Sequence, residues 1–302
     1  MVTCLYCHAS VTKSEETVQA AWFREAYQRV YGSLERPAQT VQFQAQTYGI
    51  LQRLGRGTHS DIYLAERISP LPERVILKLA LEGSTDSESA LKRAAHALDA
   101  LQQSSVQGSP YFTQRLPQPV AIGVAHGFFT GERTALVLRS APGYWGSLAD
   151  VMHCYRSKAQ AVDVRHVVWM WRRVLEVLAF VHDSGWVHQD LVPENLLVHP
   201  TDHGVQIIGW SHAENPGRDS ALCGQDLTQI AWALRALLCG GEDPTTTTLP
   251  NSVPAPLIKL LIQCESASWC TQFGARGIDQ ALRTAALEAF GAPRFIRFDP
   301  QP

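Results

Sequence analysis

Apolar residues recur at helical spacing in two long stretches of the chain. Between Glu15 and Glu35 an apolar residue stands at every fourth position and aromatic residues widen the stripe, which predicts an amphipathic helix. Between Asp163 and Asp183 the apolar positions are denser, which predicts a long buried helix. We expect the aromatic face of the first helix to be buried, either against its own domain or against a protein partner.

Shorter apolar runs predict strands. Apolar residues flank Gly55 and Gly57 on both sides, which predicts a strand, a tight turn and a returning strand. Val75–Lys78 is an apolar strand that carries one lysine, and residues 205–208 form a second short apolar run after a turn. Residues 37–46 are rich in Gln, Thr and Ala, and we interpret them as a linker.

Composition narrows the class of protein. The chain has 302 residues, of which 45% are hydrophobic, so a sizeable core is expected. The formal net charge of −2 gives no electrostatic reason to expect nucleic acid or an anionic membrane as a partner. No apolar run approaches the ~20 residues that span a bilayer, and we see no secretory signal. We therefore expect a cytoplasmic protein whose seven cysteines are reduced.

Three residues near the N-terminus suggest a metal or haem. Cys4, Cys7 and His8 form a Cys-x-x-Cys-His pattern, which is typical of c-type haem attachment and also of half a zinc site. A zinc site needs a fourth ligand, and the next cysteine, Cys154, is far outside the usual spacing. Ordinary thiols are the simpler interpretation, and the metal hypothesis stays open.

A polar motif follows the long buried helix, and it carries the functional hypothesis. It reads His188-Gln-Asp190-Leu-Val-Pro-Glu-Asn195, and a hairpin that ends at Gly209 follows it. With the glycine pair and the strand lysine before it, this ordered set resembles the eukaryotic-like protein kinase superfamily. The resemblance covers about Tyr48 to Gly291.

The resemblance implies a fold and domain boundaries. The expected fold is α+β and bilobal, with a small β-rich N-lobe over residues 47–139 and a mainly helical C-lobe over 140–302. Residues 1–46 are expected to form an N-terminal extension that contains the amphipathic helix.

The resemblance also assigns roles to residues. Asp190 stands at the position of the catalytic base, Asn195 at that of a metal-binding asparagine, and Asp226 at that of an aspartate that braces the catalytic loop. Leu138 falls at the gatekeeper position. The expected nucleotide-binding residues are Gly55, Gly57, Ser60, Ile62, Lys78, Arg139, Ala141 and Asn195.

Several residues that the family uses for chemistry are replaced. Gly209 stands where the magnesium-binding aspartate is expected, and Ala94 stands where a glutamate would pair with Lys78. Glu88 could substitute only if its helix were shifted. Gln189 and Val192 replace two further basic residues of the catalytic loop. The segment between Gly209 and Asp226 is about half as long as an activation loop and peptide platform require.

We therefore expect a pseudokinase, acting as a nucleotide-responsive or structural interaction module. ATP binding is expected to be weak and little dependent on magnesium, with no strong metal site, and a protein partner is expected on the helix at residues 15–35. The alternative is an active, atypical phosphotransferase in which Asp190 is the base and Glu214 supplies the metal carboxylate. A third hypothesis is a small-molecule kinase similar to aminoglycoside phosphotransferases, which share the motif around Asp190.

Overall fold

The computed structural model describes residues 2–3, 10–11, 38–68, 71–241 and 247–301. The predicted helix at residues 15–35 and the group Cys4, Cys7 and His8 lie outside these residues. The strands are β1 (Val2–Thr3), β2 (Ser10–Val11), β3 (Thr40–Phe43), β4 (Gln46–Arg56), β5 (Ser60–Arg67), β6 (Glu73–Ala80), β7 (Pro119–Gly127), β8 (Arg133–Arg139), β9 (Gly146–Ser147), β10 (Leu196–His199) and β11 (Gly204–Ile207). The helices are α2 (Thr85–Gln102), α3 (Ser109–Phe112), α4 (Leu148–Ser157), α5 (Val164–Asp183), α6 (Ala221–Leu238), α7 (Ala255–Gln263) and α8 (Ala267–Phe290), with short 3₁₀ turns η1 (Thr113–Arg115), η2 (Pro193–Asn195) and η3 (Trp210–His212).

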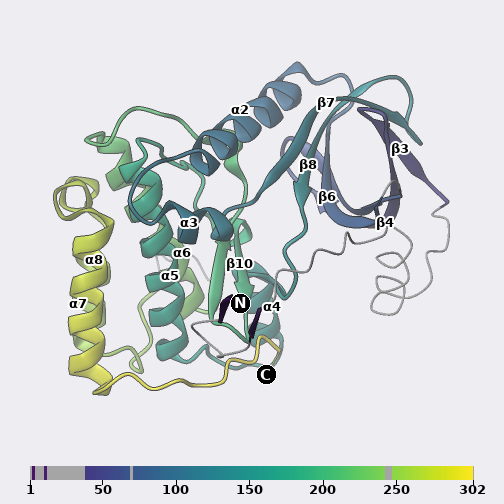
Figure 1. Cartoon of the computed structure of the whole chain (residues 1–302). Helices are drawn as coiled ribbons and strands as arrows, with labels where there is room; N and C mark the ends of the chain where they lie inside the picture. The colour runs from purple at the N-terminus through teal and green to yellow at the C-terminus, as the bar shows by residue number, and fades with distance from the viewer. Residues whose placement is uncertain (1, 4–9, 12–37, 69–70, 242–246, 302) are drawn as a thin grey trace.

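Strands β3 to β8 close into an antiparallel barrel in the order β3-β4-β5-β6-β8-β7. The ring closes because β3 pairs with β4 on one side and with β7 on the other, where Val41 lies opposite Gly127. Figure 1 shows this barrel on one side of α2 and the helices α5 to α8 on the other. The expectation of a typical bilobal kinase-like fold is therefore wrong, because the β-rich part is a closed barrel.

The segment that closes the barrel was expected to be a linker. In β3 the side chains of Val41 and Phe43 are buried inside the barrel, whereas Gln42 between them is exposed. This period of two identifies a strand, but it spans only four residues and polar neighbours obscure it. The barrel thus begins before residue 47, where the domain boundary was expected.

Alternation along the strands separates two hydrophobic cores. On β6, Leu77 and Leu79 fill the barrel interior, whereas Ile76 and Ala80 face the larger core shared with α2 and the helical part. On β8, Val137 faces the barrel interior and Leu136 faces α2. One face of the β6–β8 sheet therefore forms the barrel core and the other supports α2.

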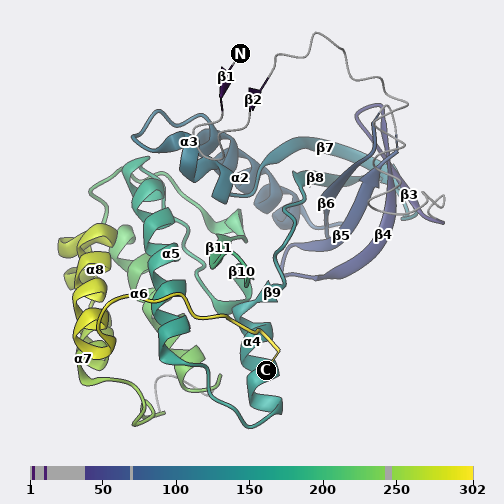
Figure 2. The ribbon, with the colours of Figure 1, turned by 60° about the horizontal axis from the view of Figure 1, so that its bottom comes forward.

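The helical part surrounds a small sheet of β9, β10 and β11. The long buried helix predicted at Asp163–Asp183 is confirmed as α5, which begins after Asp163, whose carboxylate accepts a hydrogen bond from the Arg165 N–H. Figure 2 shows β10 and β11 between α5 and the barrel, and the C-terminal segment crossing α5 towards α4. Within the described residues, none of the helices is long and apolar enough to cross a membrane.

Candidate functional site

The catalytic-loop motif lies between α5 and β10 and is held in place by α6. Asp226 is fully buried, and its carboxylate accepts hydrogen bonds from the N–H groups of His188 and Gln189, both at 2.8 Å. The same carboxylate contacts His182 Nε2 at 3.0 Å. Gln229, one turn further along α6, accepts from Leu191 N–H at 3.0 Å. The loop is thus fixed by side chains of one helix, as the resemblance implied for Asp226.

His188 has a defined protonation state in this loop. Its Nε2 lies 2.9 Å from the Ile208 carbonyl, which only accepts, and its Nδ1 accepts from the Asp190 N–H at 3.2 Å. The imidazole is therefore the neutral Nε2–H tautomer. Burial lowers the pKa of His188, against the opposing effect of the Asp226 carboxylate. Its ring packs edge-on against Trp210, so the loop is also held by a contact with η3.

The side chains of Asp190 and Asn195 contact each other directly. Asn195 Nδ2 donates to the Asp190 backbone oxygen and to its carboxylate Oδ2, both at 2.8 Å. Both of these partners are acceptors, so the amide nitrogen must face Asp190 and the amide oxygen must face the other way. The two expected catalytic-loop residues are thus brought together, with the asparagine donating to the carboxylate.

Gly209 lies directly against this asparagine. Its backbone is in the left-handed region, with φ at 84°, where a side chain is strained. A Cβ at this position would lie 2.6 Å from Asn195 Nδ2 and closer still to its Oδ1. The amide of Asn195 therefore fills the space that an aspartate side chain at position 209 would need.

Lys78 lies on β6 opposite Ile62 on β5, on the strand face that also carries Ile76 and Ala80, where the resemblance implies the nucleotide cleft. Within the described part of the chain its amino group has no ion-pair or hydrogen-bond partner, and burial lowers its pKa. Ala94, at the expected position of the partner glutamate, is buried in the core of α2. Glu88 is half exposed and pairs with Lys92 at 3.8 Å, so it does not substitute.

The glycine hairpin connects β4 and β5. Gly57 N–H donates to the Ser60 carbonyl at 2.8 Å and defines the turn, and Gly55 has open space around it. At the tip, the ring of His59 lies 5.7 Å from the ring of His212 in η3. The hairpin therefore contacts the segment that follows Gly209.

The sequence alone leaves open whether side chains such as Arg56, His59 and Trp210 fill the expected nucleotide pocket. The Arg56 guanidinium turns to Asp61 on the other face of the hairpin, and Trp210 is buried with its Nε1–H donating to the Ile207 carbonyl. Both side chains thus have hydrogen-bond partners away from Lys78.

The resemblance places Arg139 to Ala141 at the hinge whose backbone would hold adenine, and two backbone N–H groups of this segment are bonded within the protein. The N–H of Arg139 donates to Gln118 O at 2.9 Å, and the N–H of Ser140 donates to Arg74 O at 3.3 Å. The Arg139 side chain pairs with Glu73 at 3.1 Å. Two backbone donors near the expected adenine site are therefore already used, and Ala141 follows them at the end of β8.

The donor set does not fit a magnesium ion. The Asn195 amide oxygen is the atom nearest to the Cβ position of residue 209, but position 209 has no carboxylate to complete a metal site. Glu214 has an exposed side chain, and its backbone pairs with Val187. Among the described residues no group of three His, Cys, Asp or Glu side chains could hold a metal.

Two residues of the cleft's surroundings were missed from the sequence. Arg93 of α2 donates from Nε to the Ser211 carbonyl at 3.0 Å and ties α2 to η3. Asp61 of β5 is buried among three arginines. For Asp61 the sequence does offer a signal, which is a charged residue within the alternating run of β5. For Arg93 it offers none, because the partner of Arg93 is a backbone carbonyl far along the chain.

Comparisons with known proteins find distant sequence similarity to protein kinases. Calcium/calmodulin-dependent protein kinase type 1 of Macrobrachium nipponense is 28% identical over 186 residues, which cover 59% of this chain and 47% of that protein. The protein of the same name from Caenorhabditis elegans is 27% identical over 206 residues, covering 66% of this chain and 51% of that protein.

A bacterial relative is similar over a shorter stretch. Serine/threonine-protein kinase pkn2 of Myxococcus xanthus is 25% identical over 162 residues, covering 53% of this chain and 17% of that protein. The chain spans about half the length of the first two relatives. No protein-family model matches it. The chain is thus a distant homologue of serine/threonine protein kinases.

Proposed function

We propose that this kinase-like protein is a pseudokinase, a nucleotide-responsive or structural interaction module with little or no phosphoryl transfer. The observation that carries the proposal is the contact between Gly209 and Asn195. Phosphoryl transfer depends on metal ions that neutralise charge on the transferred group. Here the metal carboxylate is absent, and the neighbouring asparagine occupies its place while donating to Asp190.

The nucleotide side of the cleft supports binding more than catalysis. The Lys78 amino group has no partner among the described residues, and an anionic phosphate would stabilise its charged form. Ground-state contacts of this kind do not require a metal. We therefore expect ATP binding that is weak and little changed by magnesium, with Gly55, Gly57, Ser60, Ile62 and Lys78 as its contacts.

Thermal unfolding with ATP, in the presence and absence of magnesium, tests the binding half of the proposal. A ligand at a hundredfold excess over its Kd stabilises a protein by about 2.7 kcal/mol, so binding raises the Tm visibly. We expect Lys78→Met to remove this rise and Lys92→Met, an exposed lysine on α2, to retain it. A rise that survives Lys78→Met and vanishes with EDTA would contradict the proposal.

Turnover of the γ-phosphate tests the catalytic half. We expect wild type, Asp190→Asn and the control Asp202→Asn, which alters an exposed carboxylate outside the cleft, to be equally inactive. The retained contact of Asp190 with Asn195 favours the alternative, an active phosphotransferase on a protein or a small molecule. Wild-type turnover near ~1 to 100 per second, abolished only by Asp190→Asn, would establish that alternative.

A single restored residue is not expected to restore activity. Gly209→Asp returns a carboxylate but leaves Lys78 without its acidic partner at Ala94 and leaves Gln189 unchanged. Groups that act as a unit in catalysis are strongly non-additive, so a partial repair yields far less than a full one. A protein partner on the helix predicted at residues 15–35 remains part of the proposal.

A further inference from the structure

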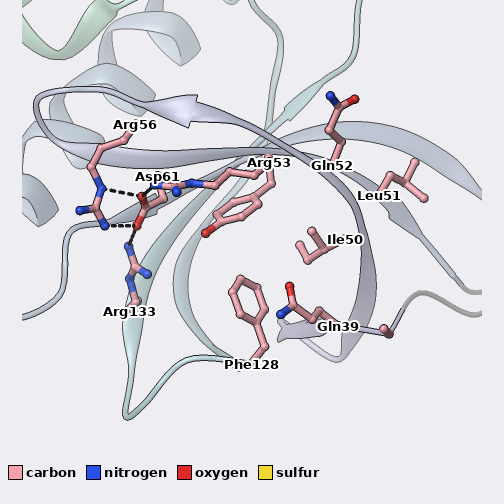
Figure 3. Close-up of a pocket in the computed structure, with 11 residues that line it drawn as sticks. Gln39, Ile50, Leu51, Gln52, Arg53, Arg56, Asp61, Phe128 and Arg133 are labelled. Carbon is pink, nitrogen blue, oxygen red and sulfur yellow. Dashed lines mark hydrogen bonds and ion pairs between the residues drawn. The ribbon is translucent and has the colours of Figure 1, made fainter.

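A cavity of about 610 Å³ opens at the end of the barrel, behind the glycine hairpin. Asp61 and Tyr63 of β5 face this cavity, whereas Ile62 between them pairs with Lys78 and faces the cleft. Side chains of a strand alternate between its two faces. The cavity and Lys78 therefore lie on opposite faces of this part of the sheet, and Figure 3 shows the residues that line the cavity.

The cavity wall carries an excess of positive charge. The carboxylate of Asp61, whose side chain is 4% exposed, binds three guanidinium groups. Arg53 approaches at 2.9 Å, Arg56 at 2.7 Å and Arg133 at 2.8 Å. The hydrogen bond from Arg56, supported by those from Arg133 and Arg53, holds the pKa of Asp61 far below its usual range despite burial. Among the residues that line the cavity, two positive charges stay unneutralised at neutral pH.

The three arginines have different roles. Arg133 is buried and also donates to the carbonyls of Ala80 and Leu79, at 2.6 and 3.2 Å, so it is fixed in place. The side chains of Arg53 and Arg56 are 54% and 62% exposed. Each uses only part of its donor set on Asp61. Their remaining N–H groups are available at the cavity mouth to an oxyanion.

The rest of the wall is apolar and aromatic. Phe128 packs edge-on against Tyr63 with ring centroids 5.6 Å apart, and Ile50 lies beside them. Phe128 is 37% exposed, so part of its ring is free to contact a ligand. In Figure 3 the arginine cluster lies at one end of the cavity and Phe128 with Ile50 towards the other.

We propose that this cavity binds a small phosphate monoester with an aromatic or other apolar group. A phosphate monoester carries about −1.5 to −2 charges near pH 7, which matches the excess on the arginine cluster. Guanidinium groups bind phosphate oxygens with paired, charge-assisted hydrogen bonds. The apolar group of the ligand lies against Phe128 and Ile50. The proposal does not depend on nucleotide binding at Lys78.

Isothermal titration of the full chain with phenyl phosphate tests the site. We expect saturable binding with a Kd below about 1 mM, weakened about tenfold or more by Arg53→Gln and by Arg56→Gln, because each removes charge-assisted hydrogen bonds. Both side chains are more than half exposed, so the variants should retain the fold, which equal Tm values verify. Inorganic phosphate should bind more weakly, because it lacks the apolar group.

Arg165→Gln is the matched control, because Arg165 is also half exposed and paired with one aspartate, Asp163, but lies outside the cavity. It should leave the Kd unchanged. Three results would overturn the proposal. The first is the absence of saturable binding up to roughly 10 mM phenyl phosphate. The second is an equal loss of affinity in Arg165→Gln. The third is a loss of affinity in Lys78→Met without one in Arg53→Gln, which would place the anion beside Lys78.

Discussion

The two sides of the cleft differ in how completely their polar groups are paired. On the catalytic-loop side, the N–H groups of residues 188, 189 and 191 are bonded to Asp226 and Gln229, and Asp190 is bonded to Asn195. On the strand side, Lys78 has no partner within the described residues and Ala94 replaces the expected acid.

This difference separates the groups that hold the loop in place from the groups that would contact metal or phosphate. The N–H groups of residues 188–191 all have acceptors inside the protein. These bonds stabilise the fold, because an unsatisfied buried polar group costs about 1–3 kcal/mol. Among the groups that would contact metal or phosphate, position 209 has no carboxylate, Asn195 is bonded to Asp190, and Lys78 has no partner within the described residues. The catalytic loop therefore acts here as a structural joint between α5, α6 and η3.

The largest effect is expected from Asp226→Ala. The substitution leaves the N–H groups of His188 and Gln189 and the ring of His182 without an acceptor in a buried site, which should lower the free energy of unfolding by about 4 kcal/mol. Chemical denaturation measures this change. Asp183→Ala breaks a more exposed pair with Arg276 and should cost less than about 1 kcal/mol. Similar losses in the two variants would contradict the proposed joint.

Gly209→Ala should have the second largest effect, a loss of about 2 to 3 kcal/mol. Part of this loss comes from the left-handed backbone and part from overlap with Asn195. Gly217→Ala is a matched control, because Gly217 also has a positive φ, at 93°, but has nothing within 4 Å of its Cβ position. The difference between the two losses measures the overlap. Equal losses would mean that Asn195 yields freely and that the space for an aspartate exists.

The smallest effect is expected at Lys78, and its sign depends on pH. Burial lowers the pKa of Lys78 in the folded state, so above that pKa the unfolded state binds more protons and stability rises with pH up to about 10.4. Lys78→Met removes the desolvated charge and should raise the Tm at pH 7, with the gain shrinking towards pH 10. The exposed Lys92→Met should show no such trend. A destabilised Lys78→Met at pH 7 would indicate a partner for the amino group.

Local patterns in the sequence predicted the elements that depend on neighbouring residues. The period of α5, the strand that carries Lys78 and the motif from His188 to Asn195 could all be recognised along the chain. The order of these motifs also pointed to the kinases that the comparisons found.

The features that were missed depend on contacts between distant residues. β3 is a strand because β7, more than 80 positions later, completes its pairing. Asp61 is buried because Arg133 reaches it from 72 positions away. The orientation of the Asn195 amide depends on which groups surround it, and composition and spacing do not specify these.

The closure of the barrel by β3 has a consequence for solubility. A strand at the edge of an open sheet presents unpaired N–H and C=O groups that can pair with another molecule, and a closed barrel has no such edge. Removing residues 1–45 would remove β3 with its Val41 and Phe43, and would leave β4 and β7 each with one unpaired side. A shortened chain that begins near residue 38 retains the closed barrel. One that begins at residue 46 exposes two unpaired strand edges and the hydrophobic barrel interior, and should aggregate.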